Sequence, residues 1–161
     1  MEKTVRKHYA SSWFFSVFIV MSATACGDAG TAPASIAGRY NVVTVNGVAV
    51  PALLAESPDE GAGVFKAYLD SGYIQVNDGG TCGASISVTY RDPADFVVDT
   101  ETDTDTCTWT QAGSTITFTH GGSVFWRDGG SSDTATLSGN RLTMTFPHWF
   151  GAGTVTLVFE R

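Results

Sequence analysis

The chain has 161 residues, and its 9 Lys and Arg against 16 Asp and Glu give a formal net charge of −7. So few scattered cations exclude a nucleic-acid-binding surface, which requires a basic patch. The length predicts a single domain with one hydrophobic core.

The first 25 residues have the layout of an export signal. Three cations, Lys3, Arg6 and Lys7, precede an apolar run from Trp13 to Met21. This run is shorter than the roughly 20 apolar residues that a membrane-spanning helix needs. We therefore expect residues 1–25 to be a signal peptide that is removed on export.

The end of the signal resembles the lipobox of bacterial lipoproteins. The small residues Ala23-Thr24-Ala25 stand directly before Cys26, and they also form an ordinary Ala-x-Ala cleavage site at the same bond. The resemblance implies that Cys26 carries acyl chains such as palmitate and becomes the first residue. In such proteins Gly27, rather than Asp, after the Cys implies the outer membrane. Residues 26–35 have the small, polar composition of a flexible tether, which leaves a domain of residues 36–161.

The cysteine count agrees with lipidation. The chain has three Cys, an odd number for an exported protein. If Cys26 takes the lipid, Cys82 and Cys107 remain as a pair for a disulfide in an oxidising compartment. Cleavage before Cys26 leaves six Lys and Arg against fifteen Asp and Glu, a net charge of −9.

Short alternating segments rich in Thr, Val, Ile and aromatic residues follow one another along the domain, separated by Gly, Asn and Asp. These segments are 39–45, 72–76, 84–90, 107–111, 115–119, 123–127, 134–137, 141–146 and 154–159. Their tight turns favour sequential antiparallel pairing. The pattern predicts an all-β fold, an up-and-down barrel of about eight strands, with a two-sheet sandwich as the alternative. One short helix or turn is expected at residues 51–57.

Both ends of the domain resemble lipocalin-like bacterial lipoproteins. The stretch 37–47 (AGRYNVVTVNG), with Pro51 shortly after, is similar to their opening strand. Segments 137–144 and 157–161 are similar to their closing strands. The resemblance implies a small barrel that either holds one apolar ligand or is filled by its own side chains.

In lipocalins the aromatic residue of the first strand lies near an Arg from the end of the barrel. Tyr40 stands at that aromatic position here, and Arg161 is the matching cation. The resemblance therefore implies that Arg161 stacks on the Tyr40 ring. The alternative is that Tyr40 is an ordinary core residue and Arg161 a solvated terminus.

A carboxylate stands at every second position before Cys107, which makes this stretch the candidate metal site. The four acids are Asp99, Glu101, Asp103 and Asp105. Oxygen ligands suit Ca²⁺, but an EF-hand loop that starts at Asp99 would have Thr104 and Thr110 where Gly and Glu are required. A looser divalent-cation site stays open.

The same four acids have the parity of Cys107 and Trp109, so one unbroken strand would place them all on one face. If Cys82 and Cys107 are directly opposite, that face also carries Ile86 and Val88. Burying unpaired carboxylates beside apolar residues is costly. We therefore expect the strand to begin near Asp105 to Cys107, and residues 92–105 to form a solvated loop.

Three large aromatic residues surround a Pro in the stretch 146–150 (FPHWF), between two predicted strands. Trp149 and Phe150, together with Trp126, are the candidate ligand-binding residues at a barrel mouth; the alternative is that the stretch plugs one barrel end. His120 and His148 are expected at the surface or in loops. Because no nucleophile, base or metal-ligand constellation is visible, we expect no enzyme.

Two functions remain open. The first is a monomeric, lipid-anchored, lipocalin-like barrel that faces the periplasm or the cell surface and binds a small apolar molecule. The second is a structural or interaction module with a packed interior, which contacts envelope proteins or glycans through its loops.

Overall fold

The computed structural model describes residues 35–59, 63–121, 131–147, 149 and 153–161. Ten β-strands account for most of them. The strands are β1 (Gly38–Val45), β2 (Val48–Ala49), β3 (Ala52–Asp59), β4 (Gly63–Val76), β5 (Thr81–Arg91), β6 (Val97–Ala112), β7 (Thr115–His120), β8 (Ser132–Ser138), β9 (Arg141–Phe146) and β10 (Val155–Glu160). Within the described residues, no helix has the length and apolarity needed to cross a bilayer.

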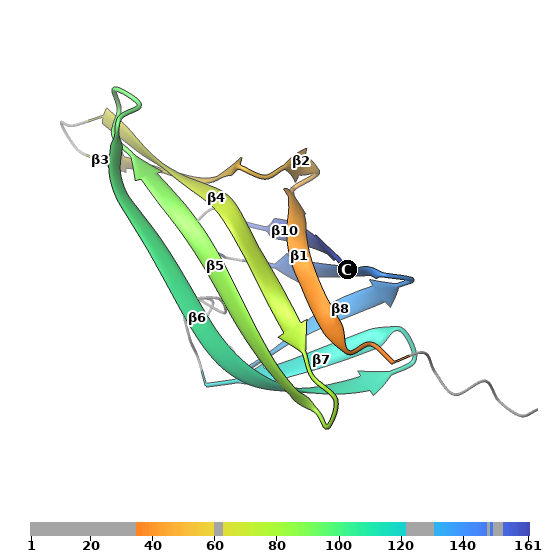
Figure 1. Ribbon diagram of the computed structural model, residues 1–161. Helices are drawn as coiled ribbons and strands as arrows, with labels where there is room; N and C mark the ends of the chain where they lie inside the picture. Colours follow the sequence, from red (N-terminus) through yellow and green to blue (C-terminus); the bar gives the residue numbers. More distant parts are fainter. Residues whose placement is uncertain (1–34, 60–62, 122–130, 148, 150–152) are drawn as a thin grey trace, which may run out of the picture. The chain divides into compact units, whose positions relative to one another are not determined.

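The strands close into an antiparallel barrel (Figure 1). From β3 to β10, each strand pairs with the next one along the chain. Strand β1 closes the barrel because it pairs with β10 on one side, Asn41 opposite Glu160, and with β4 on the other, Gly38 opposite Val76. The predicted eight-stranded up-and-down barrel is confirmed, formed by β1 and β4 to β10 with β2 and β3 in addition.

The barrel interior is filled by side chains that alternate along each strand with exposed ones. In β10 every second residue, beginning with Val155, is buried. The largest fully buried side chains come from strands all around the barrel and from the β9–β10 connection: Trp149, Tyr40, Phe118, Phe146, Phe159, Leu69, Ile74, Ile86, Ile116 and Leu142. This core has the aromatic and branched composition that a pleated, half-buried surface favours.

The prediction of a short helix at residues 51–57 is wrong, because residues 52–57 belong to β3 and Pro51 directly precedes it. Ala52 and Leu54 are buried while Leu53 is exposed, which is the period of a strand. Ala52 lies opposite Leu69 of β4. Pairing with β4 overrides the helix propensity of the Ala, Leu and Glu in this segment.

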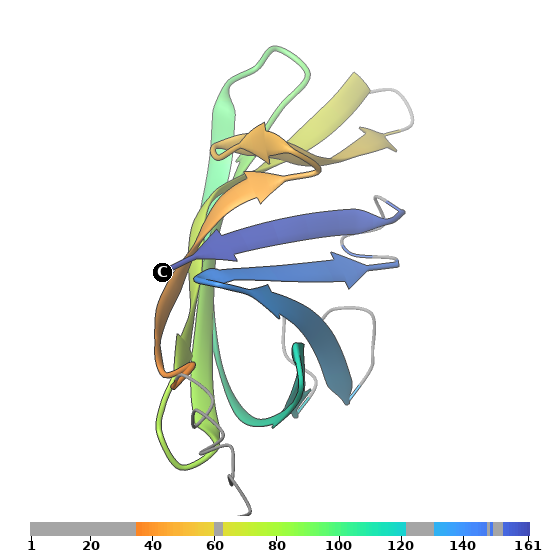
Figure 2. The same cartoon turned by 90° about the vertical axis from the view of Figure 1, so that its right-hand side faces the viewer.

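The two ends of the barrel differ. We name as the closed end the one that carries Ser35, the tight turns at residues 77–80, 113–114 and 139–140, and Arg161, and as the open end the opposite one, with the β5–β6 loop. At the open end, β3, β4, β5 and β6 continue past the rest of the barrel (Figures 1 and 2). We call this continuation the four-strand extension; its β6 portion is residues 97–106, because β7 pairs with β6 only from Cys107 to Ala112.

Candidate functional site

Arg161 and Tyr40 meet at the closed end, as the lipocalin resemblance implies. The Arg161 guanidinium carbon lies 5.5 Å from the centroid of the Tyr40 ring. Arg161 also donates hydrogen bonds to the carbonyl oxygens of Ala37 at 2.8 Å and Ser35 at 3.2 Å. Tyr40 is 0% exposed, and its hydroxyl donates to the Ile36 carbonyl at 2.9 Å. Tyr40 is thus a core residue whose ring also contacts the Arg161 guanidinium.

Gly38 leaves the space that Arg161 occupies. A Cβ at Gly38 would lie 2.6 Å from Arg161 Cδ, and the φ angle of Gly38 is +150°. Gly38→Ala is therefore expected to lower the free energy of unfolding by about 1–3 kcal/mol through strain and overpacking. Urea denaturation measures this loss. In the Arg161→Ala background the same substitution is expected to cost less; an equal cost in both backgrounds contradicts the contact.

The four carboxylates lie on one continuous strand, so the predicted break before Cys107 is wrong. Strand β6 runs unbroken through them. Asp105, Asp103 and Glu101 lie opposite Ala84, Ile86 and Val88 of β5, which are buried. Directly opposite residues share a face, and these acids therefore occupy the inner face of the sheet.

The physical reason is that this inner face is only partly covered. The acids lie in the four-strand extension, beyond the last residue of β6 that pairs with β7. Asp99 and Glu101 are exposed there, and Asp103 and Asp105 are half-buried. The prediction assumed that the inner face of β6 is covered by the core along its whole length, whereas β6 extends beyond the core.

The straight ladder does not gather ligands around a single point. Neighbouring acids on one strand face are about 6.6 Å apart, because each residue advances the strand by about 3.3 Å. In the described part of the chain, no group of three or more His, Cys, Asp or Glu side chains is placed to hold a metal ion. The arrangement does not resemble the six to eight converging oxygens of a calcium site.

The two cysteines predicted to pair lie directly opposite each other. Cys82 of β5 and Cys107 of β6 form a cross-strand pair with their sulfur atoms at disulfide distance and their Cα atoms 4.8 Å apart. Cys107 is also the first β6 residue that pairs with β7, opposite His120. The cross-link therefore sits where the four-strand extension joins the barrel.

Removal of the disulfide is expected to lower the free energy of unfolding by about 3.5 kcal/mol, because the cross-link restricts a loop with a sequence separation of 25 in the unfolded chain. The variant is Cys82→Ala with Cys107→Ala, and urea denaturation followed by Trp fluorescence measures the change. Thr81→Ala with Thr108→Ala alters the neighbouring cross-strand pair and serves as the control. A cysteine-free variant as stable as the control would refute the cross-link.

His120 is buried, contrary to the expected surface position. Its side chain is 0% exposed, and its Nε2 lies 3.0 Å from Asp133 Oδ2, on the neighbouring strand β8. His120 ends β7, whose alternate residues Ile116 and Phe118 are also buried. The imidazole of His120 is therefore shielded from solvent, and its interaction with Asp133 is part of the barrel interior. His148 lies outside the described residues.

Trp149 is 0% exposed and stacks on Phe146, with ring centroids 5.2 Å apart. Its ring therefore offers no face to a ligand in this structure, and the plug is the interpretation that fits its burial. Phe150 and Trp126, the other two candidate ligand-binding residues, lie outside the described residues.

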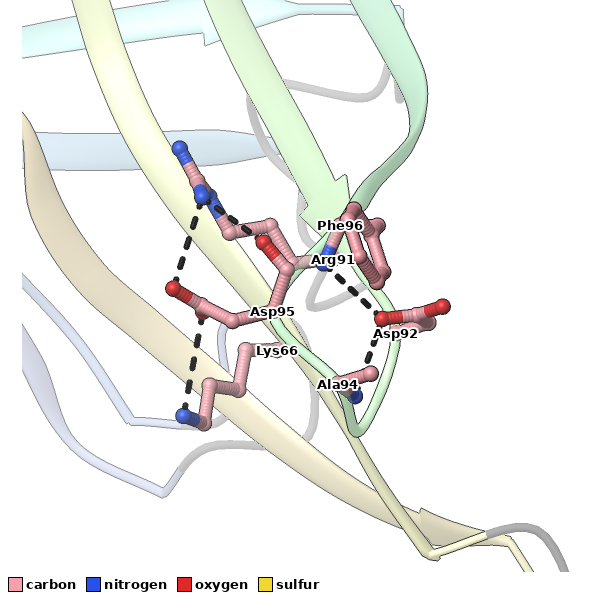
Figure 3. A network of polar contacts seen from close by, with 6 residues as sticks. All are labelled: Lys66, Arg91, Asp92, Ala94, Asp95 and Phe96. Atoms are coloured by element: carbon pink, nitrogen blue, oxygen red, sulfur yellow. Dashed lines mark hydrogen bonds and ion pairs between the residues drawn. The ribbon is translucent and has the colours of Figure 1, made fainter.

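The β5–β6 loop at the open end is held by a polar network that the sequence did not reveal (Figure 3). Asp92 Oδ1 accepts hydrogen bonds from the backbone N–H groups of Ala94 and Phe96, both at 2.9 Å. The Asp95 carboxylate lies 3.5 Å from Arg91 and 4.0 Å from Lys66. The available signal was the Asp-Pro-Ala-Asp stretch, which is typical of an Asx turn.

This ordered loop presents apolar side chains to solvent. Phe96 is 70% exposed, and Val97 and Val98, which follow it into β6, are exposed by more than half. A preorganised loop loses little conformational entropy on binding, which favours contact through such residues. The open end therefore combines an apolar tip with the acidic inner face of β6.

Three hollows formed by described residues lie on different faces of the sheet. One of about 370 Å³ lies at the outer face of β1, β4, β5 and β6, beside Arg39, which stacks 3.6 Å above the Tyr73 ring. Another of about 390 Å³ lies between Tyr68, Asp70 and Arg91. A third, of about 120 Å³, lies on the inner face of the four-strand extension beside Phe65, Ala67 and Tyr90.

The closed eight-stranded antiparallel barrel is consistent with a lipocalin-like fold, and the Tyr40–Arg161 contact agrees with it. Cys26, the predicted lipidation site, lies outside the described residues. The chain matches no protein-family model, no curated protein and no solved structure.

Proposed function

We propose that this protein is a non-enzymatic, lipid-anchored component of the bacterial cell envelope that acts as an interaction module, contacting proteins or glycans through its open end. The observation that carries the proposal is the filled interior. Large side chains from β1, β7, β9 and β10 are fully buried, and Trp149 stacks over Phe146 among them. A barrel filled in this way presents its surface, rather than its lumen, to other molecules.

The hollows support the same proposal. Pockets for drug-sized molecules typically measure about 300–1,000 Å³ and are mostly apolar. The apolar hollow on the inner face, beside Phe65 and Tyr90, is below that range, at about 120 Å³. The inner face of β6 in the four-strand extension carries Glu101, Asp103 and Asp105 instead of an apolar lining.

The proposed anchor fits an interaction at the open end. The described chain starts at Ser35 and enters β1 at the closed end. The tip of the β5–β6 loop, with Phe96, belongs to the opposite end (Figure 1). Anchored in the outer membrane through Cys26, the module would meet molecules of the periplasm or cell surface.

Native mass spectrometry of the mature protein, purified from membranes in detergent, tests the packed interior. We expect the mass of the lipidated polypeptide without a bound small molecule, unchanged by calcium. A photo-crosslinking residue at Phe96 should give a discrete cross-linked product in intact cells, and the same residue at the exposed Ser114 of the closed end should not. Equal labelling at both positions would contradict an interaction through the open end.

The second candidate function is a lipocalin-like carrier of one small apolar molecule. The contact of Arg161 with Tyr40, which the resemblance implies for lipocalins, favours it. A small molecule of defined mass retained in the same native spectrum would support the carrier and overturn the packed interior.

A further inference from the structure

The outer edge of β6 is the feature from which we argue. The Trp109 N–H donates to the Gly80 carbonyl at 2.8 Å, and the register with β5 is constant from Thr81–Thr108 to Tyr90–Asp99. Odd-numbered residues of β6 therefore direct their backbone groups toward β5, since both groups of a residue point to the same side in an antiparallel ladder.

Even-numbered residues of β6 direct their N–H and C=O groups to the opposite side. From residue 108 onward these groups face β7, which pairs with β6 from Cys107 to Ala112. Before that point, no described strand pairs with them. We call the backbone of the following four residues the β6 edge: Thr100, Thr102, Thr104 and Thr106. It is about 20 Å long, at about 3.3 Å per residue.

Carboxylates of the strand itself cover part of this edge. Asp99 Oδ1 accepts a hydrogen bond from the Thr100 N–H at 2.8 Å, and Asp105 Oδ1 accepts one from the Thr106 N–H at 2.7 Å. The other Asp105 oxygen, Oδ2, is buried and has no hydrogen-bond partner among the described residues. Two N–H groups of the edge are thus occupied, while one buried anionic oxygen lacks a donor.

We propose that the β6 edge is a docking site for an extended protein segment that carries Lys or Arg at every second position and adds to the sheet as a further strand. The proposal rests on the proposed function as an interaction module and names the kind of partner for one part of the open end. Strand addition of this kind takes its affinity from backbone hydrogen bonds and its specificity from alternate side chains.

The choice of a cationic segment follows from the carboxylates. An incoming strand must replace Asp99 and Asp105 as the acceptors at Thr100 and Thr106. A neutral strand would leave the Asp105 carboxylate, whose Oδ2 is buried, without a donor, which is costly. Lys or Arg opposite the two carboxylates, on the same face, supplies the donor and the opposite charge.

Pairing of the β6 edges of two copies of this chain is disfavoured by the same charges. Pairing of two β6 edges would set the carboxylates of one strand against those of the other, and like charges directly opposite destabilise a sheet. Charged residues on edge strands commonly prevent such self-association. The carboxylates of β6 therefore favour pairing with a cationic strand and disfavour pairing with another β6 strand.

Peptide binding to the mature protein in detergent tests the proposal by fluorescence anisotropy. The probe is a labelled nine-residue peptide of alternating Thr and Lys, and three peptides are compared with it. One has the same charges with N-methyl groups on alternate backbone nitrogens, one has the same composition with its Lys residues in a block, and one has Glu in place of Lys. We expect the alternating Lys peptide to bind at least about tenfold more tightly than each of the others.

Variants locate the binding. Asp99→Asn with Asp105→Asn is expected to lower the affinity for the Lys peptide about tenfold, since two opposite-charge pairs are lost. Thr102→Pro removes an N–H group near the centre of the edge, and edge strands tolerate such a change. This variant is also expected to bind the Lys peptide more weakly. Glu56→Gln with Asp78→Asn removes two exposed charges elsewhere and should leave binding unchanged. Circular dichroism verifies that each variant is folded.

Each contrary result overturns the proposal. Equal binding of the N-methylated or the block peptide means attraction by charge alone, without strand addition. If the variant with two Asn substitutions or the Thr102→Pro variant binds the peptide as tightly as the wild type, the peptide binds at a site other than the β6 edge. If the Lys peptide does not bind at all while Phe96 still cross-links in cells, the strand-docking site is refuted and the interaction module stands.

Discussion

Cys26→Ser is expected to release the protein from membranes almost completely. Each acyl chain contributes about 0.8 kcal/mol per buried methylene, so several chains on one Cys bind a bilayer far more firmly than a single myristoyl group. A hydroxyl at this position cannot form the thioether that starts lipidation. Fractionation of cells into soluble and membrane material, followed by immunoblotting, measures the change.

The released variant must still be exported for this result to be meaningful. Ala23-Thr24-Ala25 remains as an ordinary cleavage site, and export can be verified because Cys82 and Cys107 then resist thiol labelling without reductant. Thr24→Ser, which keeps a small residue before the Cys, should stay in the membrane fraction. If the Cys26→Ser protein remained membrane-bound, the lipid anchor would be wrong.

Trp149→Ala is expected to lower the free energy of unfolding by about 3–5 kcal/mol, the usual cost of truncating a fully buried aromatic side chain. Trp149 is 0% exposed and stacks on Phe146, so its loss leaves a cavity beside the Phe146 ring. Urea denaturation monitored by circular dichroism measures the loss, because the substitution itself changes the fluorescence.

Trp149→Phe is the matched control, since it keeps a ring opposite Phe146 and should cost less than the Ala variant. The same pair of variants separates a plug from a ligand contact. As a plug, Trp149 affects stability alone. If the Ala variant were as stable as the wild type but lost a small molecule that the wild type retains, Trp149 would be a ligand-binding residue instead.

The barrel could be predicted because the sequence signals that specify its strands and turns are local. Alternation of residue types and the Gly and Asn turns identify most strands, and tight turns impose antiparallel neighbours. The segment at residues 51–57 failed because it is rich in Ala, Leu and Glu, and only its pairing with β4 makes it a strand. No local pattern contains that information, since the partner strand decides it.

The candidate site was predictable only in part. A directly opposite pairing of Cys82 and Cys107 would put Glu101 on the face of Val88, a register that we rejected because it buries carboxylates. The structure has this register, and the rejection was wrong because parity does not reveal how far a strand continues beyond the core. The burial of His120 depends on Asp133 of the next strand, and their spacing follows no motif. Long-range relations of this kind require the fold itself.

Closure of the barrel makes the order of folding matter. Strand β1 can pair with β4 early, but its other edge is completed only by β10, from Asn41 opposite Glu160 to Val45 opposite Leu157. Contacts between the two ends of a domain form slowly, because a long loop must close first. During folding the first strand therefore keeps an unpaired edge until the last strand has formed. Any holding factor that the protein needs would act in that interval, on β1.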